Sequence, residues 1–411
     1  MLSVEEALVR VLADLAPLPR EDRDLLAALG QVLVADVVAG IDLPPYDHST
    51  MDGYAVRAAD TRNAGEANPV TLRVLATAPA GHTTAESVTA GTAIRIMTGA
   101  PLPSSADAVV PLEHTTAEVT NGGRTVGIRQ PVGPRANVRR AGQDTRTGDV
   151  VLRQGTVVGP AAVAMAASLG HRTLPVHRRP RVAILATGDE LVAPGEPLGP
   201  GQIYSGNAYY LAAQVLRRGG VPQLLGIAKD QAADLRAKIR EASGADLLIT
   251  SGGVAGGDFD LVKDVLAAEG EIAFREVAMW PGKRLVFGRI GSLPHLGLPG
   301  GPGAAATSFE VFAVPAIARM LGLRNWQRPT VEATILDAAK NRGGLRTFLA
   351  VSVERRDGGY VARLSGTRRP GSLPWLTPAN GLAVIPEDVP QVEPGDRVQV
   401  MLLAWPEGPP C

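Results

Sequence analysis

Apolar and polar positions follow a strand, turn and helix pattern in one stretch of the chain. Residues 245–250 form a short, mostly apolar run, which is typical of a buried parallel strand. Residues 251–260 are a glycine-rich turn, and residues 261–266 place apolar side chains at helical spacing. This order directs backbone N–H groups and a helix N-terminus toward an anion, usually a phosphate. A tight turn with Asp260 as a helix N-cap explains the same residues, so both interpretations stay open.

The same alternation extends over residues 179–325. Strands are predicted at 182–186, 223–228, 284–288 and 296–298, and helices at 207–218, 230–242 and 304–321. Asn207 and Asp230 are the predicted caps of the first two helices. Repeated βα units predict a doubly wound, mostly parallel sheet with helices on both faces. Ligands bind such sheets beyond the carboxyl ends of the strands, where the polar and glycine-rich clusters of this domain fall.

Three further regions are predicted around this α/β domain. Residues 1–40 and 145–178 form an N-terminal helical linker region, in which Ser3 and Glu6 are a capping-box pattern. Additional helices in this region are predicted at 24–29 and 160–169. Residues 41–144 have the short Val, Ile and Thr runs of a mostly β insert, and residues 326–411 predict a small C-terminal β barrel or sandwich. The expected fold is therefore multidomain α/β plus β.

The amino-acid composition excludes several classes of partner and location. The 411 residues carry 41 basic and 41 acidic side chains, so no charge excess indicates nucleic acid or a membrane surface as partner. No apolar run is long enough to span a bilayer, and the first residues lack the order of a signal peptide. Cys411 is the only cysteine, so no intrachain disulfide can form. A cytoplasmic location is therefore expected.

Two polar clusters in the insert have no obvious packing role. One covers residues 44–55 and contains Asp52, and the other covers residues 97–103 and contains Thr98. Taken alone, each is better explained as a turn with side-chain to backbone hydrogen bonds. A functional interpretation is favoured only when all the polar and glycine-rich clusters of the chain are considered together.

Together the clusters resemble the molybdopterin molybdenumtransferases, the MoeA family, related to the E domain of gephyrin. The resemblance covers nearly the whole chain and rests on PPYDHSTMDGYAV at 44–56, RIMTGAPLP at 95–103, TGDEL at 187–191, SGGVAGGDFDLVKDV at 251–265, PGK at 281–283 and LPGGP at 298–302. It implies insertion of molybdate into adenylylated molybdopterin, with release of AMP and help from Mg²⁺ or another divalent cation. It also implies a homodimer that contacts the molybdopterin adenylyltransferase and acceptor molybdoenzymes.

The resemblance assigns roles to individual residues. The implied catalytic residues are Glu190, Asp230 and Asp260, which are also the implied metal ligands, together with Asp52 and Thr98, which act across the dimer interface. The implied cofactor-binding residues are Thr187, Gly188, Ser251, Gly252, Gly253, Gly257, Lys283, Pro299, Gly300, Pro302 and Ser372.

Some positions depart from the usual family sequence. Trp280 replaces a lysine before Pro281-Gly282-Lys283, and an indole cannot supply a positive charge, although it can stack on a pterin or adenine. Gly301 and Gly303 stand where the family loop usually has side chains, and Ser205 stands where an acidic or amide residue is common. Two alternatives therefore stay open: a non-catalytic paralogue that binds molybdopterin or its adenylate, and a nucleotide pyrophosphatase of the competence/damage-inducible type.

Overall fold

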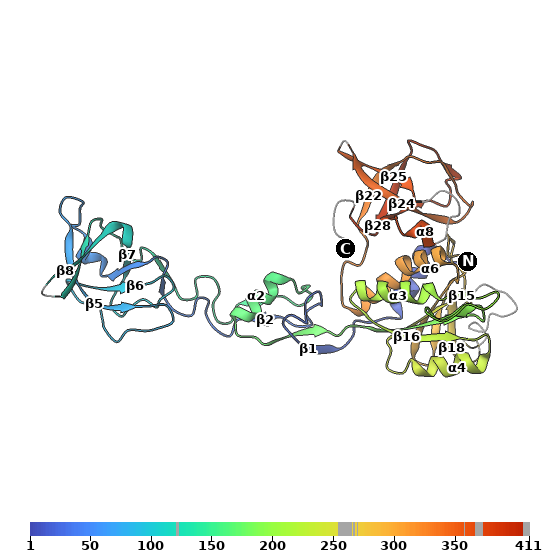
Figure 1. The fold of residues 1–411 in the computed structure, drawn as a ribbon, viewed down its shortest axis with the longest axis horizontal. Helices are drawn as coiled ribbons and strands as arrows, with labels where there is room; N and C mark the ends of the chain where they lie inside the picture. The colour runs from blue at the N-terminus through green and yellow to red at the C-terminus, as the bar shows by residue number, and fades with distance from the viewer. Residues whose placement is uncertain are drawn as a thin grey trace. The chain divides into compact units, whose positions relative to one another are not determined.

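The chain folds into two compact units. The computed structural model describes residues 1–120, 123–253, 265, 268, 270–356, 358–365 and 373–405. One unit comprises Met1–Arg23, Ala28–Val34 and Pro175–Cys411, and the other comprises Asp24–Ala27 and Ala35–Leu174 (Figure 1). Among the described residues, no helix has the length and apolar character needed to cross a membrane.

The first unit contains the predicted α/β sheet. Its strands, in spatial order, are β16 (Val221–Ala228), β13 (Arg181–Thr187), β17 (Leu247–Ser251), β21 (Leu293–Leu298), β20 (Val286–Ile290) and β18 (Gly270–Phe274). The first four run parallel; β20 pairs antiparallel with β21, and β18 pairs antiparallel with β20. The helices are α1 (Val4–Ala13), α3 (Gly206–Arg217), α4 (Ala232–Glu241), α6 (Pro302–Ser308) and α7 (Val314–Met320), the last two joined by a π-helical turn, Phe309–Ala313. The mostly parallel, doubly wound sheet is therefore confirmed.

Alternation along β13 explains why helices cover both faces of the sheet. Ile184 packs in one buried cluster with Leu211 of α3, whereas its neighbour Leu185 packs in another with Leu235 of α4. Successive side chains of a strand point to opposite faces, so a wholly apolar strand needs an apolar partner on each side. Figure 1 shows α3 and α4 on opposite sides of the sheet.

Three predictions about local structure in this region are wrong. Residues 25–30 form turns and not a helix, because Asp24 ends a strand, β1 (Arg20–Asp24), that pairs with β12 (Thr173–His177). Pairing with a distant segment overrides local helix propensity there. Asn207 and Asp230 are not caps, since the N-cap residues of α3 and α4 are Ser205 and Gln231. The capping box of Ser3 and Glu6 at α1 is confirmed.

The rest of the first unit is a closed barrel that follows the α/β sheet in the chain. Its strands are β24 (Arg346–Arg356), β25 (Gly359–Leu364), β22 (Thr330–Ile335), β28 (Arg397–Leu402) and β26 (Gly381–Ile385), and a β24–β26 pairing closes the ring. Strand β19 (Met279–Trp280) from the α/β region extends β24. Shorter elements are the pair β14 (Leu191–Val192) and β15 (Ile203–Tyr204), the pair β23 (Ala339–Lys340) and β27 (Gln391–Val392), and α8 (Leu373–Leu376).

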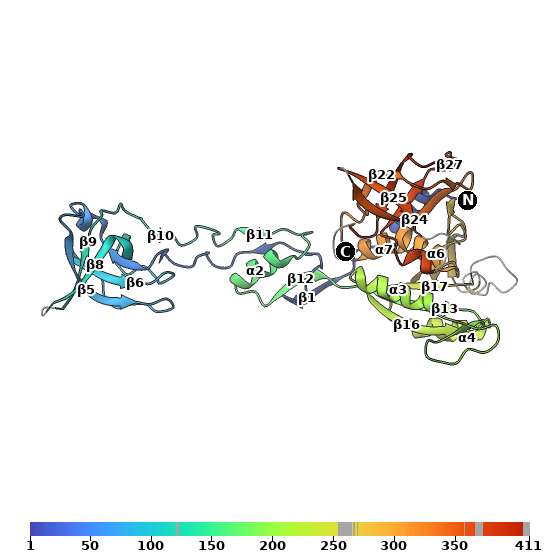
Figure 2. The same cartoon turned by 45° about the horizontal axis from the view of Figure 1, so that its top comes forward.

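The second unit is mostly β, as predicted. Its six-stranded sheet has the order β7 (Ala108–Pro111), β4 (Gly53–Val56), β6 (Thr92–Ile96), β5 (Val70–Ala78), β9 (Gly123–Ile128) and β8 (Thr115–Thr120). Figure 2 labels four of these strands, β5, β6, β8 and β9. Two short antiparallel pairs join β3 (His48–Ser49) to β10 (Val138–Arg139) and β2 (Val37–Val38) to β11 (Val150–Leu152). One helix, α2 (Pro160–Ser168), follows them, and short 3₁₀ turns cover Ala58–Thr61 and Leu112–His114.

Candidate functional site

A cavity of about 470 Å³ opens at the carboxyl ends of the parallel strands. It is walled by the ends of β13 and β17 and by the starts of α3 and α6. The predicted site residues that line it are Thr187, Gly188, Glu190, Asp230, Ser251, Gly252, Gly253, Gly300 and Pro302. Four segments far apart in the sequence therefore meet at the edge where ligands bind in parallel sheets.

Two carboxylates face this cavity. Glu190 and Asp230 both line it, and the backbone N–H of Asp189 donates to Asp230 Oδ2 across 3.4 Å. The N–H of Asp230 donates in return to Asp189 Oδ1 across 3.1 Å, so the two turns carrying these carboxylates are tied together. Carboxylate oxygens are the ligands that Mg²⁺ prefers, so this donor set fits a divalent cation. Asp260, the third predicted ligand, lies outside the described residues, and the described part of the chain contains no cluster of three such side chains.

The floor of the cavity requires glycine at two of the predicted positions. Gly252 has a φ of +100°, and a Cβ there would lie 2.6 Å from the carbonyl oxygen of Thr187. Gly188 has a φ of +146°, and the carboxylate of Glu190 folds over the space that a side chain would fill. A positive φ and a close backbone approach are the conditions under which glycine is needed. Glycine at these positions lets the strand ends approach one another closely, and the N–H groups of Gly188 and Gly252 donate to the carbonyl oxygens of Ala228 and Leu298 across 3.1 and 3.0 Å.

Asn207 holds two walls of the cavity in place. Its Nδ2 donates to the hydroxyl oxygen of Ser251 across 3.0 Å and to the carbonyl oxygen of Gly300 across 2.8 Å. It therefore links α3, the end of β17 and the loop before α6. The sequence interpretation missed this role because an asparagine near a predicted helix start is explained equally well as a cap. The cavity lining also includes Ser205, which that interpretation noted but left out of the site.

Asp52 and Thr98 form a pair in the second unit. The backbone N–H and the hydroxyl of Thr98 both donate to Asp52 Oδ1, across 2.7 and 2.8 Å. These two hydrogen bonds, the backbone one first, hold the pKa of the exposed Asp52 carboxyl below its usual value, with a smaller contribution from Arg95. Residues that are 46 positions apart in the chain are therefore brought together, and the carboxylate stays ionised near neutral pH.

The remaining predicted residues stand apart from the cavity lining or outside the described chain. Lys283 is exposed on the loop after β19, and Pro299 is partly buried beside Gly300; neither belongs to the lining. Gly257 and Ser372 lie, like Asp260, outside the described residues. Trp280 packs against the barrel core, and the Arg342 guanidinium lies 4.9 Å from its ring centroid. One face of the indole is therefore already covered by a cation.

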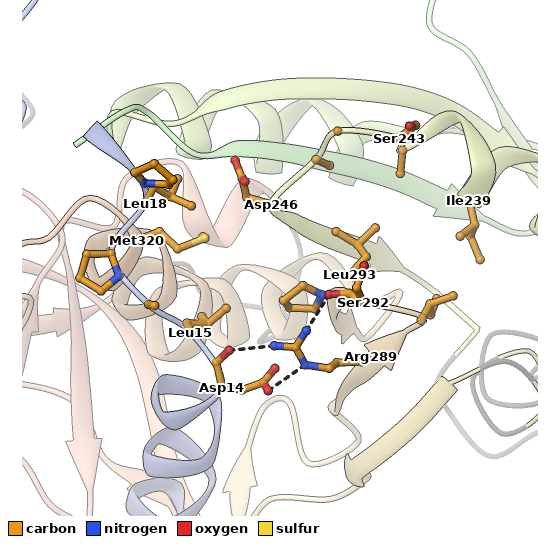
Figure 3. Close-up of a pocket in the computed structure, with 18 of the residues that line it drawn as sticks. Asp14, Leu15, Leu18, Ile239, Ser243, Asp246, Arg289, Ser292, Leu293 and Met320 are labelled. Carbon is orange, nitrogen blue, oxygen red and sulfur yellow. Dashed lines mark hydrogen bonds and ion pairs between the residues drawn. The ribbon is translucent and has the colours of Figure 1, made fainter. Parts of the chain in front are cut away.

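A second cavity, of about 670 Å³, lies at the opposite ends of the strands (Figure 3). Asp246, which precedes β17, lines it, whereas Ser251 at the other end of the same strand lines the first cavity. Arg289 crosses its wall, where Nε donates to Asp14 Oδ1 across 2.8 Å and Nη2 donates to the Asp14 carbonyl across 3.0 Å, as Figure 3 shows. None of the predicted site residues lines it, so we assign the candidate site to the first cavity.

Comparison with known proteins identifies the family of the chain. Family profiles match residues 2–170 ("MoeA N-terminal region (domain I and II)"), 183–319 ("Probable molybdopterin binding domain") and 332–403 ("MoeA C-terminal region (domain IV)"). The chain is 42% identical to molybdopterin molybdenumtransferase 2 of Mycobacterium tuberculosis over 92% of this chain and 93% of the relative. It is 38% identical to molybdopterin molybdenumtransferase of Nostoc sp. over 92% and 88%.

A solved structure extends the likeness to the fold. The crystal structure of the molybdopterin biosynthesis MoeA protein from Pyrococcus horikoshii matches with a TM-score of 0.83 and 33% identity, over 98% of this chain and 99% of that one. With near-complete coverage, consecutive domain matches and a shared fold, this chain belongs to the molybdopterin molybdenumtransferase, or MoeA, family.

Proposed function

We propose that this protein is a molybdenum insertase that acts on adenylylated molybdopterin and molybdate and gives Mo-molybdopterin and AMP. The observation that carries the proposal is the single cavity in which Glu190 and Asp230 face glycine turns at the strand ends. A pterin with a pyrophosphate needs main-chain donors for its phosphoryl oxygens, and a bound cation needs carboxylates. The cavity is lined by these two carboxylates and by the uncapped first turn of α3, and the family to which the chain belongs is named for this transfer.

We assign a role in substrate or cation binding to each group of residues that lines the cavity. Glu190 and Asp230 would hold Mg²⁺ or another divalent cation, which when bound neutralises charge on the phosphoryl groups. Gly188, Gly252 and Gly253 line the cavity with positive φ angles, and a Cβ at Gly188 or Gly252 would clash with Glu190 or Thr187, so glycine is what gives this wall its shape. Thr187, Ser251, Gly300 and Pro302 shape the same wall. The protein thus orients the substrate and balances its charge.

We also propose roles for the predicted residues outside this lining. In a homodimer, Asp52 and Thr98 would be supplied by the partner copy, with Asp52 kept ionised by its hydrogen bonds to Thr98. Lys283 would balance oxyanion charge, Pro299 would support the loop before α6, and Gly257, Asp260 and Ser372 would complete ligand and metal binding. The adenylyltransferase that makes the substrate and the molybdoenzymes that accept the product are the proposed partners, in the cytoplasm.

An assay of AMP release tests the proposal. Full-length protein incubated with adenylylated molybdopterin should release AMP only when both molybdate and Mg²⁺ are present. Glu190→Gln and Asp230→Asn should each lower the rate by about 100-fold, the usual effect of removing one preorganised electrostatic contact. Glu196→Gln, a change to an exposed carboxylate outside the cavity lining, is the matched control and should keep the rate.

The alternatives give different results in the same experiment. If the unmodified protein binds the adenylate and leaves it intact with molybdate and Mg²⁺ present, the insertase proposal is wrong and the protein is a non-catalytic paralogue. Hydrolysis of ADP-ribose would instead indicate a nucleotide pyrophosphatase. Rescue of a strain that lacks its insertase, lost again with Asp260→Ala, would support insertion and the role of the residue that the described structure does not include.

A further inference from the structure

Ser205 is a helix N-cap residue that does not cap. It precedes the twelve-residue helix α3, and serine is among the residues whose side chains best accept hydrogen bonds from a helix's first turn. Here the side chain makes no capping hydrogen bond. Its hydroxyl oxygen is buried and has no hydrogen-bond partner among the described residues, and the residue is only 3% exposed. The Ser205 hydroxyl therefore has no hydrogen-bond partner. The first N–H groups of α3 likewise have no capping side chain as acceptor.

These unpaired groups face the candidate site. Ser205, Gly206 and Asn207 all line the cavity, so the start of α3 forms part of its wall. The first N–H groups of a helix have no acceptor within the helix, and the macrodipole makes this end positive. Without a capping side chain, they remain available to an acceptor in the cavity. An unpaired buried hydroxyl is also unfavourable and is explained when a ligand pairs with it.

A second hydroxyl adds to the same wall. Ser251 is 3% exposed, lines the cavity, and accepts a hydrogen bond from Asn207 Nδ2 across 3.0 Å. Because its oxygen is the acceptor, the hydroxyl proton is free to donate, and no acceptor for it is found in the described part of the chain. Asn207 lies in the first turn of α3, so it holds Ser251 beside the start of this helix. Hydroxyls and amides that can all donate suit an anion with several oxygens.

We propose that Ser205, the first-turn amides of α3 and Ser251 form a subsite for a tetrahedral oxyanion. The carboxylates Glu190 and Asp230 take the cation, and this donor-lined wall takes the anion. The inference rests on the proposed function, since the oxyanion is either a phosphoryl group of the adenylate or molybdate itself. The buried Ser205 hydroxyl has no hydrogen-bond partner in the described chain, and an oxygen of the bound group would supply one.

Binding measurements on the full chain test the subsite without relying on turnover. Calorimetry with AMP plus Mg²⁺, and separately with molybdate, should show that Ser205→Ala weakens binding of at least one anion by about tenfold, as expected for loss of a hydrogen bond to a charged group. Ser243→Ala, in the second cavity, should leave both affinities unchanged.

Comparing the two anions shows whether the subsite binds a phosphoryl group or molybdate. A loss confined to AMP assigns the subsite to a phosphoryl group, and a loss confined to molybdate assigns it to the metal oxyanion. A measurement without ligand adds an independent check: Ser205→Asp should raise the thermal midpoint, because aspartate caps the open helix start. The inference is overturned if Ser205→Ala, folded as the unmodified protein, binds both anions equally well, or if the unmodified protein binds neither.

The same data distinguish this inference from the proposed function. If AMP affinity depends on Ser205 while no molybdate-dependent AMP release occurs, the subsite is supported and the insertase proposal fails. If molybdate-dependent AMP release occurs and Ser205→Ala changes neither the AMP nor the molybdate affinity, the insertase proposal is supported and the subsite inference is overturned.

Discussion

Gly252 and Gly300 face each other at the cavity but differ in what a side chain would meet. A Cβ at Gly252 would lie 2.6 Å from the Thr187 carbonyl oxygen, and the residue has a φ of +100°. A Cβ at Gly300 would find its nearest atom, Gly252 Cα, at 3.6 Å, an ordinary contact. We therefore expect Gly252→Ala to cost about 1–3 kcal/mol of unfolding free energy, the usual size of backbone strain, and to weaken AMP binding.

Gly300→Ala is the matched control for this prediction. It adds the same methyl group to the same cavity, yet should lower stability by less than about 1 kcal/mol, since the glycine there has no positive φ to preserve. Urea unfolding and calorimetric AMP titration measure both variants. Equal effects from the two substitutions would show that the close approach of Thr187 and Gly252 is not what shapes the cavity.

The sequence predicted the site best where a residue follows a strand directly. Thr187 and Ser251 end parallel strands and Gly252 follows directly, and the geometry of such sheets brings those ends together whatever the details of packing. Ser205 and Asn207 were not predicted as part of the site, because a residue at a helix start has a sufficient local explanation as a cap. Their roles depend on hydrogen bonds, made or missing, to segments some 45 and 90 residues away, which no local pattern contains.

At the scale of elements, a buried ion pair links the α/β sheet to the barrel. Glu310 lies in the π-helical turn and is 2% exposed in its side chain, where it pairs with Arg328 from the segment before β22. Arg328 Nη1 also donates to the carbonyl of Leu403, which follows β28, across 3.3 Å. Gln214 of α3 donates to the other carboxylate oxygen across 3.2 Å. One acidic side chain thus ties three elements together.

Breaking this pair from one side should be costly. Arg328→Ala leaves the Glu310 carboxylate buried with weaker compensation from Arg218, 3.8 Å away, so we expect a loss of about 3 kcal/mol of unfolding free energy. The double variant Glu310→Leu/Arg328→Met should recover most of the loss, because it also removes the buried carboxylate that Arg328→Ala leaves without its main partner. Urea unfolding provides the measurement.

An exposed ion pair provides the control for the Glu310–Arg328 prediction. Arg356 and Glu354 are both 59% exposed, and Arg356→Ala should change stability by less than about 1 kcal/mol. If the double variant were as unstable as Arg328→Ala alone, loss of the ion pair's geometry, and not an uncompensated charge, would explain the effect. No sequence pattern indicated this link, since Glu310 reads only as one polar residue in a predicted helix at 304–321.

At the scale of the whole molecule, the second unit has an apolar face without a described partner. Val38 and Val150 are cross-strand partners in the β2–β11 pair, so their side chains share a face, and they are 45% and 42% exposed. A two-stranded sheet is marginally stable by itself. Because the proposed homodimer must bury apolar surface somewhere, we expect this face to contact the second copy.

Charging this face should dissociate the dimer. Val38→Lys/Val150→Lys places two like charges in the proposed interface, and we expect the dissociation constant from sedimentation velocity to rise at least tenfold. Val221→Lys, at a site 46% exposed on the edge strand of the other unit, is the control and should leave the assembly unchanged. If the double variant is still dimeric, the interface lies elsewhere. If it is monomeric and also loses AMP release while retaining AMP affinity, the result supports a partner copy that supplies Asp52 and Thr98 to a cavity that binds ligand without them.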